Sequence, residues 1–228
     1  MANNVSSKEP SEEDFKELKE RCLIIFTADP TQELNDAALW RFLRAFRTAD
    51  AAFNAIIKCN NWRREYGVEK IGPDNEFILK ELTSQKMVLI KNRDLKGRPV
   101  IYIAARKHSV YERDINEFTK FIVYMLENAC KRCFEDVIDN LCIVFDLKDF
   151  KMSCMDYEFV KNLIWLLSKY YPERLGVCLI INAPLLFNGC WSVIRPWLND
   201  VTARKVSFVK SEMELCKYFN PDILPTDD

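Results

Sequence analysis

Two short segments, 141–147 and 176–182, constrain the fold more than any other feature. They read LCIVFDL and GVCLIIN, and each is followed by a longer segment whose apolar residues recur with the helical period. A strand that is apolar at consecutive positions must be covered on both faces, which is typical of parallel strands that lie between helices. The alternation therefore predicts an α/β fold with a mostly parallel sheet flanked by helices.

Two more strands are predicted before these segments, at 86–92 and 98–105. The turn between them, RDLKGR, carries Gly97, and a tight hairpin turn needs a residue that tolerates a positive φ. A short strand is predicted at 204–210. The remaining segments are amphipathic and predict helices at 115–136, 156–171 and 185–198, with a short helix within 212–225.

The first third of the chain carries three amphipathic stripes and no strand pattern. These stripes predict helices at 11–26, 35–47 and 48–68, with Ser11 as the N-cap of the first helix and Gly67 as the residue that ends the third. We therefore expect two lobes, a helical N-terminal lobe at residues 1–84 and an α/β lobe at residues 85–228.

Composition excludes several classes of protein. Apolar residues make up 49% of the chain and charged residues 29%, and 33 basic against 34 acidic side chains leave a net charge of −1. Nucleic-acid binding relies on a net basic face, so we expect no nucleic-acid partner. The sequence has no run of 18 apolar residues, and its N-terminus is polar with no apolar signal segment. We expect a cytoplasmic protein.

The sequence lacks the common motifs of catalysis and cofactor binding. Its five glycines form no phosphate-binding loop, and no GxSxG motif positions a serine nucleophile. A His-based triad is excluded because His108 is the single histidine, and we expect it in an exposed loop. Asp146, Asp149 and Asp156 follow a strand, where capping of the next helix explains some of them. We predict that the chain is not an enzyme and uses no cofactor.

The nine cysteines are an odd number, and most of them have apolar neighbours. Free, buried thiols in a reducing compartment are the simplest interpretation. Cys130 and Cys133 form a CxxC pair, but they fall in the middle of a predicted helix, with no second pair and no nearby histidine. We therefore predict no metal site.

The segment 184–198, PLLFNGCWSVIRPWL, is apolar on nearly every side of a helix. Such a helix is either buried in a core, or it covers an apolar ligand and separates from it. The pattern alone leaves both interpretations open. Gly189 and Pro196 are the positions where such a lid would bend.

Several segments together resemble one known family. They are LWRFLRAFRTADAAFNAIIKCNNWRREYG, GRPVIYI, IVFDLKDF, YYPERLGVCLIINAP, RPWLNDVTARKV and LPTDD, in that order and spacing. The pattern is similar to the CRAL-TRIO lipid-exchange family, and within it to the phosphatidylinositol-transfer branch. This resemblance covers residues 36 to 225. It implies a helical N-terminal lobe, an α/β lobe with a large apolar lipid pocket on its sheet, and a mobile gating helix at 185–198.

The resemblance also implies which residues hold the lipid headgroup. In the phosphatidylinositol-transfer branch a glutamate of the YPER segment and a threonine and a lysine after the gate have this role, and Glu173, Thr202 and Lys205 match them. A lysine supplies a point charge for phosphate, a hydroxyl adds a hydrogen bond, and a carboxylate accepts from inositol hydroxyls or orients the lysine. We assign Arg174 to the surface.

Strand residues are assigned to the acyl chains, and the apolar helix to the gate. Residues at alternate positions of a strand share one face. In the segment 141–147 both faces are apolar, so a cavity that has one of these faces as its floor would be hydrophobic. The predicted acyl pocket comprises Leu141, Ile143, Phe145, Leu179 and Ile181. The predicted gate comprises Phe187, Trp191, Ile194 and Trp197.

Two departures from the family pattern bear on the ligand. The family carries a further headgroup arginine where this chain has Phe46, and Arg47 lies one residue later, which turns its side chain by about 100° around a helix. Phosphatidylcholine-binding members carry hydroxyl side chains where this chain has Leu141 and Ile143. These departures favour a more apolar ligand or a different lipid pose.

We therefore predict a monomeric lipid-transfer protein that carries a phospholipid, phosphatidylinositol foremost, and associates transiently with membrane surfaces. A two-chain lipid exposes tens of methylenes to water at about 0.8 kcal/mol each, so exchange must take place at the membrane. One alternative is a carrier of a single apolar ligand such as a retinoid, tocopherol or sterol-like molecule. Another is a membrane-tethering or interaction module of a longer protein, and an enzyme is the weakest candidate.

Overall fold

The computed structural model describes residues 9–134 and 137–225. By its internal contacts the chain divides into two compact units, Met1–Glu69 with Lys169–Glu173, and Lys70–Ser168 with Arg174–Asp228. Residues 76–84, which the predicted N-terminal lobe included without a predicted helix, form helix α4 (Glu76–Ser84), which packs against α5 (Ile115–Cys130) and strand β1 (Met87–Arg93) of the larger unit. The division by contacts therefore falls after Glu69, whereas the prediction placed a boundary after residue 84.

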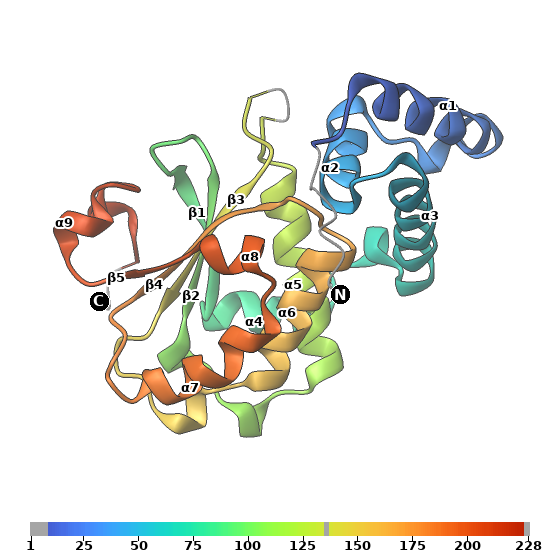
Figure 1. Cartoon of the computed structure of the whole chain (residues 1–228). Coiled ribbons are helices and arrows are strands. Elements are labelled where there is room, and N and C mark those ends of the chain that lie inside the picture. Colours follow the sequence, from blue (N-terminus) through green and yellow to red (C-terminus); the bar gives the residue numbers. More distant parts are fainter. Residues whose placement is uncertain (1–8, 135–136, 226–228) are drawn as a thin grey trace. The chain divides into compact units, whose positions relative to one another are not determined.

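The smaller unit contains three helices, α1 (Glu12–Ala28), α2 (Asp36–Phe46) and α3 (Ala49–Tyr66) (Figure 1). The predicted caps are confirmed, because Ser11 forms a capping box with Asp14 and Gly67 ends α3 at φ 70°. The apolar stripes of the three helices meet in one core of Leu18, Cys22, Leu39, Phe42, Leu43 and Ile56. Tyr170 completes this unit, and its ring stacks on Trp62 at 3.9 Å between centroids.

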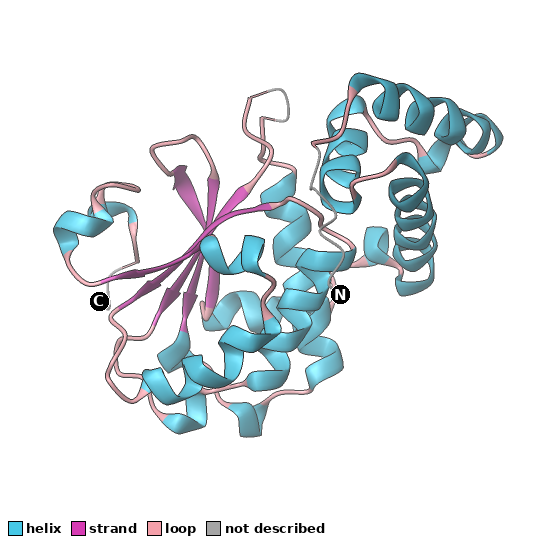
Figure 2. Cartoon of the chain, in the orientation of Figure 1, coloured by secondary structure: helices cyan, strands magenta, loops and turns pink. Residues whose placement is uncertain are grey.

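The larger unit is built on a five-stranded sheet, β1-β2-β3-β4-β5 in chain order (Figure 2). The strands after β1 are β2 (Pro99–Ala104), β3 (Leu141–Asp146), β4 (Leu175–Ile181) and β5 (Val206–Val209). Strand β1 pairs antiparallel with β2 through the predicted hairpin, where Gly97 adopts φ 83°, and the other pairs are parallel. The predicted α/β fold with a mostly parallel sheet is thus confirmed.

Helices α4 to α8 cover one face of this sheet, as Figure 1 shows. Sequential parallel strands joined by right-handed crossovers place all their crossover helices on the same side. The crossover elements are α5, α6 (Tyr157–Lys169), α7 (Phe187–Ile194), the 3₁₀ turn η6 (Arg195–Trp197) and α8 (Asp200–Arg204). Shorter 3₁₀ turns are η1 (Pro30–Gln32), η2 (Val68–Lys70), η3 (Ala105–Lys107), η4 (Val110–Glu112), η5 (Met152–Cys154) and η7 (Pro221–Ile223).

The other face of the sheet is covered by the C-terminal segment, which includes α9 (Glu212–Leu215). Leu215 and Phe219 pack there against alternate strand residues such as Val144 and Leu179. The Leu95 amide, in the β1-β2 turn, donates a hydrogen bond to the carbonyl of Tyr218 at 2.7 Å. We call the two sides the helix-covered face and the C-terminal face.

Two predicted helices end differently in the structure. The helix predicted at 115–136 ends at Cys130, so Cys133 lies beyond it, and residues 135–136 lie outside the described part of the chain. The Arg132 guanidinium there donates to the carbonyl of Ile90 at 2.7 Å, a contact of the turn with β1 that local periodicity does not encode. The helix predicted at 185–198 is α7 followed by η6, because Pro196 lacks the amide that a continuing α-helix needs.

Candidate functional site

The register of the sheet divides the predicted acyl-pocket residues between its two faces. Ile143 pairs with Cys178, and Phe145 pairs with Ile180, so these residues share the helix-covered face with Leu141. Leu179 and Ile181 alternate with Ile180 and pack on the C-terminal face with Leu215. A pocket on one face of the sheet would therefore be lined by at most three of these five residues, and Cys178 and Ile180 are the β4 residues that share the helix-covered face. A strand that is apolar at consecutive positions does not reveal which face is which.

Helix α7 lies on the helix-covered face and presents the predicted gate residues to it. Phe187, Cys190 and Ile194 are buried and pack in one cluster with Ile180 and Phe150. The Trp191 ring meets the Phe208 ring edge to face at 5.2 Å, and the Trp197 ring meets the Tyr157 ring at 5.8 Å. The structure thus brings the four predicted gate residues to one apolar cluster.

The solvent-facing side of this segment is mixed, because three large apolar side chains are exposed there beside the polar Asn188 and Ser192. Leu185 is 88% exposed, Leu186 54% and Val193 45%. Helix α7 begins without a side-chain cap, and Asn182 in the loop before it adopts φ 54°. Exposed leucine and valine side chains of this kind have a cost of exposure to water that burial in an apolar surface would remove.

The predicted headgroup residues come from both compact units. Glu173 belongs to the smaller unit by contacts and adopts φ 56°, while Thr202 and Lys205 lie in the larger unit. Asn199 caps α8 by accepting from the Thr202 amide at 2.7 Å, and the Lys205 carbonyl accepts from the Cys178 amide at 2.8 Å. Thr202 and Lys205 are thereby held at the amino end of β5, and their assembly with Glu173 stays a prediction.

The conformation of the chain at the end of α2 sets the direction of the Arg47 side chain. It adopts φ 72° as the C-cap residue, and its guanidinium contacts the Glu9 carboxylate at 3.2 Å. The Phe46 ring stacks with the Phe42 ring at 6.2 Å between centroids. In this chain the position of the family arginine is therefore part of the apolar packing of the smaller unit.

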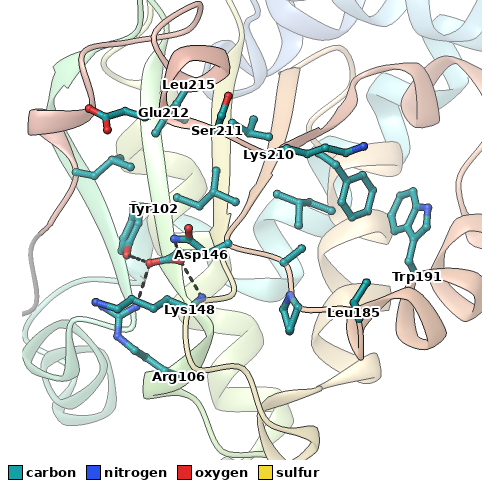
Figure 3. A pocket seen from close by; sticks show the side chains of 18 of the residues that line it. Tyr102, Arg106, Asp146, Lys148, Leu185, Trp191, Lys210, Ser211, Glu212 and Leu215 are labelled. Carbon is teal, nitrogen blue, oxygen red and sulfur yellow. Dashed lines mark hydrogen bonds and ion pairs between the residues drawn. The ribbon is translucent and has the colours of Figure 1, made fainter.

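A cavity of about 1130 Å³ opens at the carboxyl ends of the strands (Figure 3). In open parallel sheets this end is where ligands bind. One wall is polar and includes Tyr102, Arg106, Asp146, Lys148 and Asn182. The other wall is apolar and includes Pro184, Leu185, Trp191 and Phe208. Two predicted site residues, Ile181 and Trp191, line this cavity.

Asp146 organises the polar wall. Its carboxylate accepts from the Tyr102 hydroxyl at 2.5 Å, from Asn182 Nδ2 at 2.8 Å and from the Lys148 amide at 2.9 Å, and it contacts Arg106 Nη1 at 3.0 Å. Burial raises the pKa of Asp146, but these hydrogen bonds and the charge of Arg106 outweigh burial and hold the pKa below its ordinary value. Sequence reasoning treated Asp146 as a capping candidate and missed the cations beside it.

His108 and Arg174 were expected at the surface, and both are buried. His108 is 8% exposed, stacks on Phe118 at 5.0 Å between ring centroids and places Nε2 3.0 Å from the Asp156 carboxylate. Arg174 is also 8% exposed, and its guanidinium donates to the carbonyl of Asp139 at 2.7 Å. Each contact joins distant segments, so no local pattern could have shown it.

The cysteines form no disulfide and are free thiols. Burial raises the pKa of Cys22 to about 11 and that of Cys178 to about 12. Such thiols carry little thiolate at neutral pH and are poor nucleophiles. Within residues 9–134 and 137–225, no group of three or more potential ligand side chains is arranged to hold a metal ion.

The comparisons with known proteins decide the family. Residues 83–227 match the family model described as the CRAL/TRIO domain. This chain belongs to the CRAL/TRIO family. A solved structure, a crystal structure of Sfh5, superposes with a TM-score of 0.76 over 95% of this chain and 85% of the other, at 19% identity, which establishes the fold.

Curated relatives cover most of this CRAL/TRIO chain. A CRAL-TRIO domain-containing protein of Schizosaccharomyces pombe is 36% identical over 82% of the chain, and the phosphatidylinositol transfer protein CSR1 of Eremothecium gossypii is 31% identical over 72%. The Sec14 cytosolic factor of Schizosaccharomyces pombe is 27% identical over 86%. The chain spans 44%, 36% and 74% of the lengths of these three proteins.

Among the described residues, no helix has the length and apolar character needed to cross a bilayer.

Proposed function

We propose that this chain binds a phospholipid, phosphatidylinositol foremost, in a pocket that α7 gates, and exchanges it at membranes. The observation that carries this proposal is the apolar contact side of α7 together with the large apolar side chains that are exposed on and directly before this helix. Its inner residues Phe187 and Ile194 are buried, while Leu186 and Val193 on the other side face solvent. Membership of the CRAL/TRIO family and the resemblance to a phosphatidylinositol transfer protein support the same function.

The inner contacts of α7 are of the kind that lipid chains can replace. Phe187, Ile194 and Trp191 pack on Ile180 and Phe208 of the sheet. Moving α7 outward would expose these apolar groups to water, and burying them again against acyl chains recovers about 25 cal/mol for each Å² of apolar surface. In the bilayer interface the exposed Leu186 and Val193 would gain as well. Opening is therefore favoured at the membrane and disfavoured in water.

The headgroup side of the proposal places phosphate beside the amino end of β5. Lys205 offers an ammonium and Thr202 a hydroxyl there, both positioned by the Asn199 cap and by the pairing of β4 with β5. Glu173 would accept from inositol hydroxyls. The account requires a peripheral, cytoplasmic protein that acts as a monomer, with no catalytic step.

A carrier of a single apolar ligand is the second candidate. Phe46 is packed into apolar contacts where the family has an arginine, and Leu141 and Ile143 are almost fully buried on the helix-covered face. These positions offer no polar group to a headgroup. Mass spectrometry of the native protein isolated from cells, with extraction of its bound lipid, distinguishes a phospholipid from such a ligand.

Transfer of labelled lipids between liposomes tests the headgroup assignment. We expect Lys205→Ala to slow phosphatidylinositol transfer at least tenfold, because a charged contact to phosphate is worth about 1.5–3 kcal/mol. Transfer of a neutral or apolar cargo should change little. Lys217→Ala, at an exposed lysine of the C-terminal segment, is the control for loss of one positive charge. An equal loss for every lipid would count against a headgroup role for Lys205.

A further inference from the structure

Strand β5 lies at one edge of the five-stranded sheet, beside β4 (Figure 2). Its four residues are all partly exposed, whereas the six residues of β2, which lies between two strands, are all buried. An edge strand presents a row of backbone amides and carbonyls with which another extended chain can pair. The outer edge of β5 is therefore a candidate binding surface for an extended segment.

The register of β4 with β5 identifies the backbone groups that point outward. Cys178 pairs with Val206, and the Cys178 amide donates to the Lys205 carbonyl at 2.8 Å. Alternate residues of a parallel strand bond to the same neighbour, so Ser207 faces β4, while Val206 and Phe208 present their amides and carbonyls to the other side. Within the described part of the chain, these four outward groups have no hydrogen-bond partner. An added strand would satisfy them.

The opposite edge of the sheet, at β1, is covered by a side chain. The Arg132 guanidinium donates to the carbonyl of Ile90 at 2.7 Å and also to the carbonyl of Lys91. At the end of β5, the Glu214 carboxylate accepts from the Lys210 amide at 2.8 Å, so the available edge ends before Lys210. Pairing with another chain is thus open at the outward groups of β5 and hindered at β1.

The side chains beside the β5 edge offer an apolar contact. The rings of Phe208 and Trp191 meet edge to face at 5.2 Å, and both residues are partly exposed and line the cavity at the strand ends. When a strand is added to a sheet, main-chain hydrogen bonds supply affinity and contacts of alternate side chains supply specificity. Every second side chain of an added strand would lie on the helix-covered face, where Phe208 favours an apolar residue.

The charges beside β5 distinguish between two occupants of this edge. Residues 201–211 contain three cations, Arg204, Lys205 and Lys210, and no carboxylate, and carboxylates resume at Glu212 in α9. In an antiparallel pair of two copies of this chain, the cations before β5 of one copy would lie opposite Lys210 of the other. Like charges directly opposite each other destabilise a strand pair. A different chain with an acidic residue at each end would gain contacts instead.

We propose that β5 binds an extended segment of a partner protein, which adds to the sheet as a further strand. The segment alternates apolar and polar residues and carries an acidic residue at each end. Its backbone pairs with Val206 and Phe208, its apolar side chains contact Phe208 and Trp191, and its acidic ends lie near the exposed Arg204 and Lys210. The edge is short, which is typical of a transient contact. This interaction goes beyond the proposed lipid exchange and does not depend on it.

Binding of a fluorescein-labelled peptide, Glu-Val-Thr-Val-Thr-Val-Glu, to the full chain tests this proposal by fluorescence anisotropy. Two further peptides carry N-methyl groups on the valines or on the threonines. Only alternate amides of an added strand face its neighbour, so one methylated peptide should bind at least tenfold more weakly and the other about as well as the unmodified probe. A peptide with lysine in place of both glutamates should bind about fivefold more weakly.

Phe208→Pro is the matching change in the protein. It removes an amide that points away from β4, so the ladder with β4 is kept, and proline is tolerated at such positions of an edge strand. Phe208→Ala is the matched control, because it also loses the ring but keeps the amide. We expect Phe208→Pro to bind the probe at least tenfold more weakly than Phe208→Ala does. Thermal unfolding of both variants verifies that they are folded.

Three outcomes would overturn the site. Equal binding of the two methylated peptides would mean that the probe does not add as a strand, and equal binding by folded Phe208→Pro and Phe208→Ala would mean that it does not pair with β5. A wild-type dimer in analytical ultracentrifugation that becomes a monomer in Phe208→Pro would mean that a second copy of this chain occupies the edge. None of these measurements involves lipid, so failure of phosphatidylinositol transfer would leave the site standing.

Discussion

Asp156 joins two segments of the larger unit, residues 108–113 and the start of α6, through one buried carboxylate. The Arg113 guanidinium contacts it at 2.7 and 2.9 Å, His108 Nε2 lies 3.0 Å away, and the Phe159 amide donates at 3.0 Å. Burial raises the pKa of Asp156, but the hydrogen bonds from His108, Arg113 and Phe159 outweigh it and hold the pKa well below its ordinary value. This residue therefore acts as a cap for α6 and as an anchor for the 108–113 segment.

Asp156→Asn should lower the free energy of unfolding at pH 7 by about 1.5–3 kcal/mol, because Arg113 loses its charged contacts to a buried carboxylate and keeps only the contact to Glu158, whose side chain is exposed. A carboxylate whose pKa is lower in the folded state than in the unfolded state stabilises the protein at pH values above the unfolded-state pKa, which is about 3.9 for aspartate. That stability is lost as the pH falls below this value towards the folded pKa. Denaturant unfolding from pH 7 to pH 3 should thus show the difference between wild type and variant shrinking below about pH 4. A difference that is constant over this range would contradict the charged role.

The capping part of this arrangement was predictable from the sequence, and the rest was not. Asp156 precedes an amphipathic segment, which is the local signature of an N-cap. His108 lies 48 residues away, and Arg174 contacts a carbonyl 35 residues away. His108 and Arg174 are buried by contacts with residues far away in the sequence. Local sequence does not encode such contacts, so both residues were predicted to be exposed.

Two glycines, Gly176 in strand β4 and Gly189 in helix α7, differ in the space around their Cα atoms. A Cβ on Gly176 in β4 would lie 2.2 Å from Asn140 Oδ1 and 2.9 Å from Arg98 Cδ. Arg98 is 6% exposed, and its Nε is held 2.5 Å from the Asp94 carboxylate, so it cannot move aside easily. Gly189 in α7 has no heavy atom within 4 Å of its Cβ position.

Gly176→Ala should therefore destabilise the protein by about 1–3 kcal/mol through overpacking. Gly189→Ala should be neutral or should stabilise it by up to about 1 kcal/mol, since alanine favours a helix. Chemical denaturation of the two variants beside the wild type measures both effects. The packing account fails if Gly176→Ala is as stable as the wild type, and Gly189→Ala controls for the alanine itself.

The existence and type of most elements could be predicted from the sequence, because strand and helix periods differ. The faces of the strands could not. Residues 177–181 are all apolar, so alternation along the strand does not show which side chains point to which face of the sheet. The pairing of β3 with β4 shows that Ile180 lies on one face and that Leu179 and Ile181 lie on the other. That Phe187, Trp191, Ile194 and Trp197 would lie in one apolar cluster was easier to predict, because they share a helical stripe.

At the scale of the whole chain, the described larger unit has a sheet covered by helices on one face and by the C-terminal segment on the other. The alternation of strands and helices predicted the parallel sheet and its helices. It did not predict that Leu215 and Phe219 would cover the second face, since 212–225 carries a short and irregular apolar pattern. The cavity lies where that segment approaches the strand ends, which explains why it was not foreseen either.

The central claim is that α7 contacts the membrane when the cargo exchanges. To test this contact, we would measure the rate of phosphatidylinositol transfer between liposomes by the double variant Leu186→Asp/Val193→Asp. The two substitutions place negative charges at exposed positions on and directly before α7 and leave its buried residues unchanged. The control is Leu79→Asp/Leu95→Asp, at leucines that are 55% and 69% exposed elsewhere in the same unit. We predict transfer at least tenfold slower than wild type for the first pair, because charges resist entry into the bilayer, and near wild-type transfer for the control. Transfer at the wild-type rate by folded Leu186→Asp/Val193→Asp protein would contradict the account.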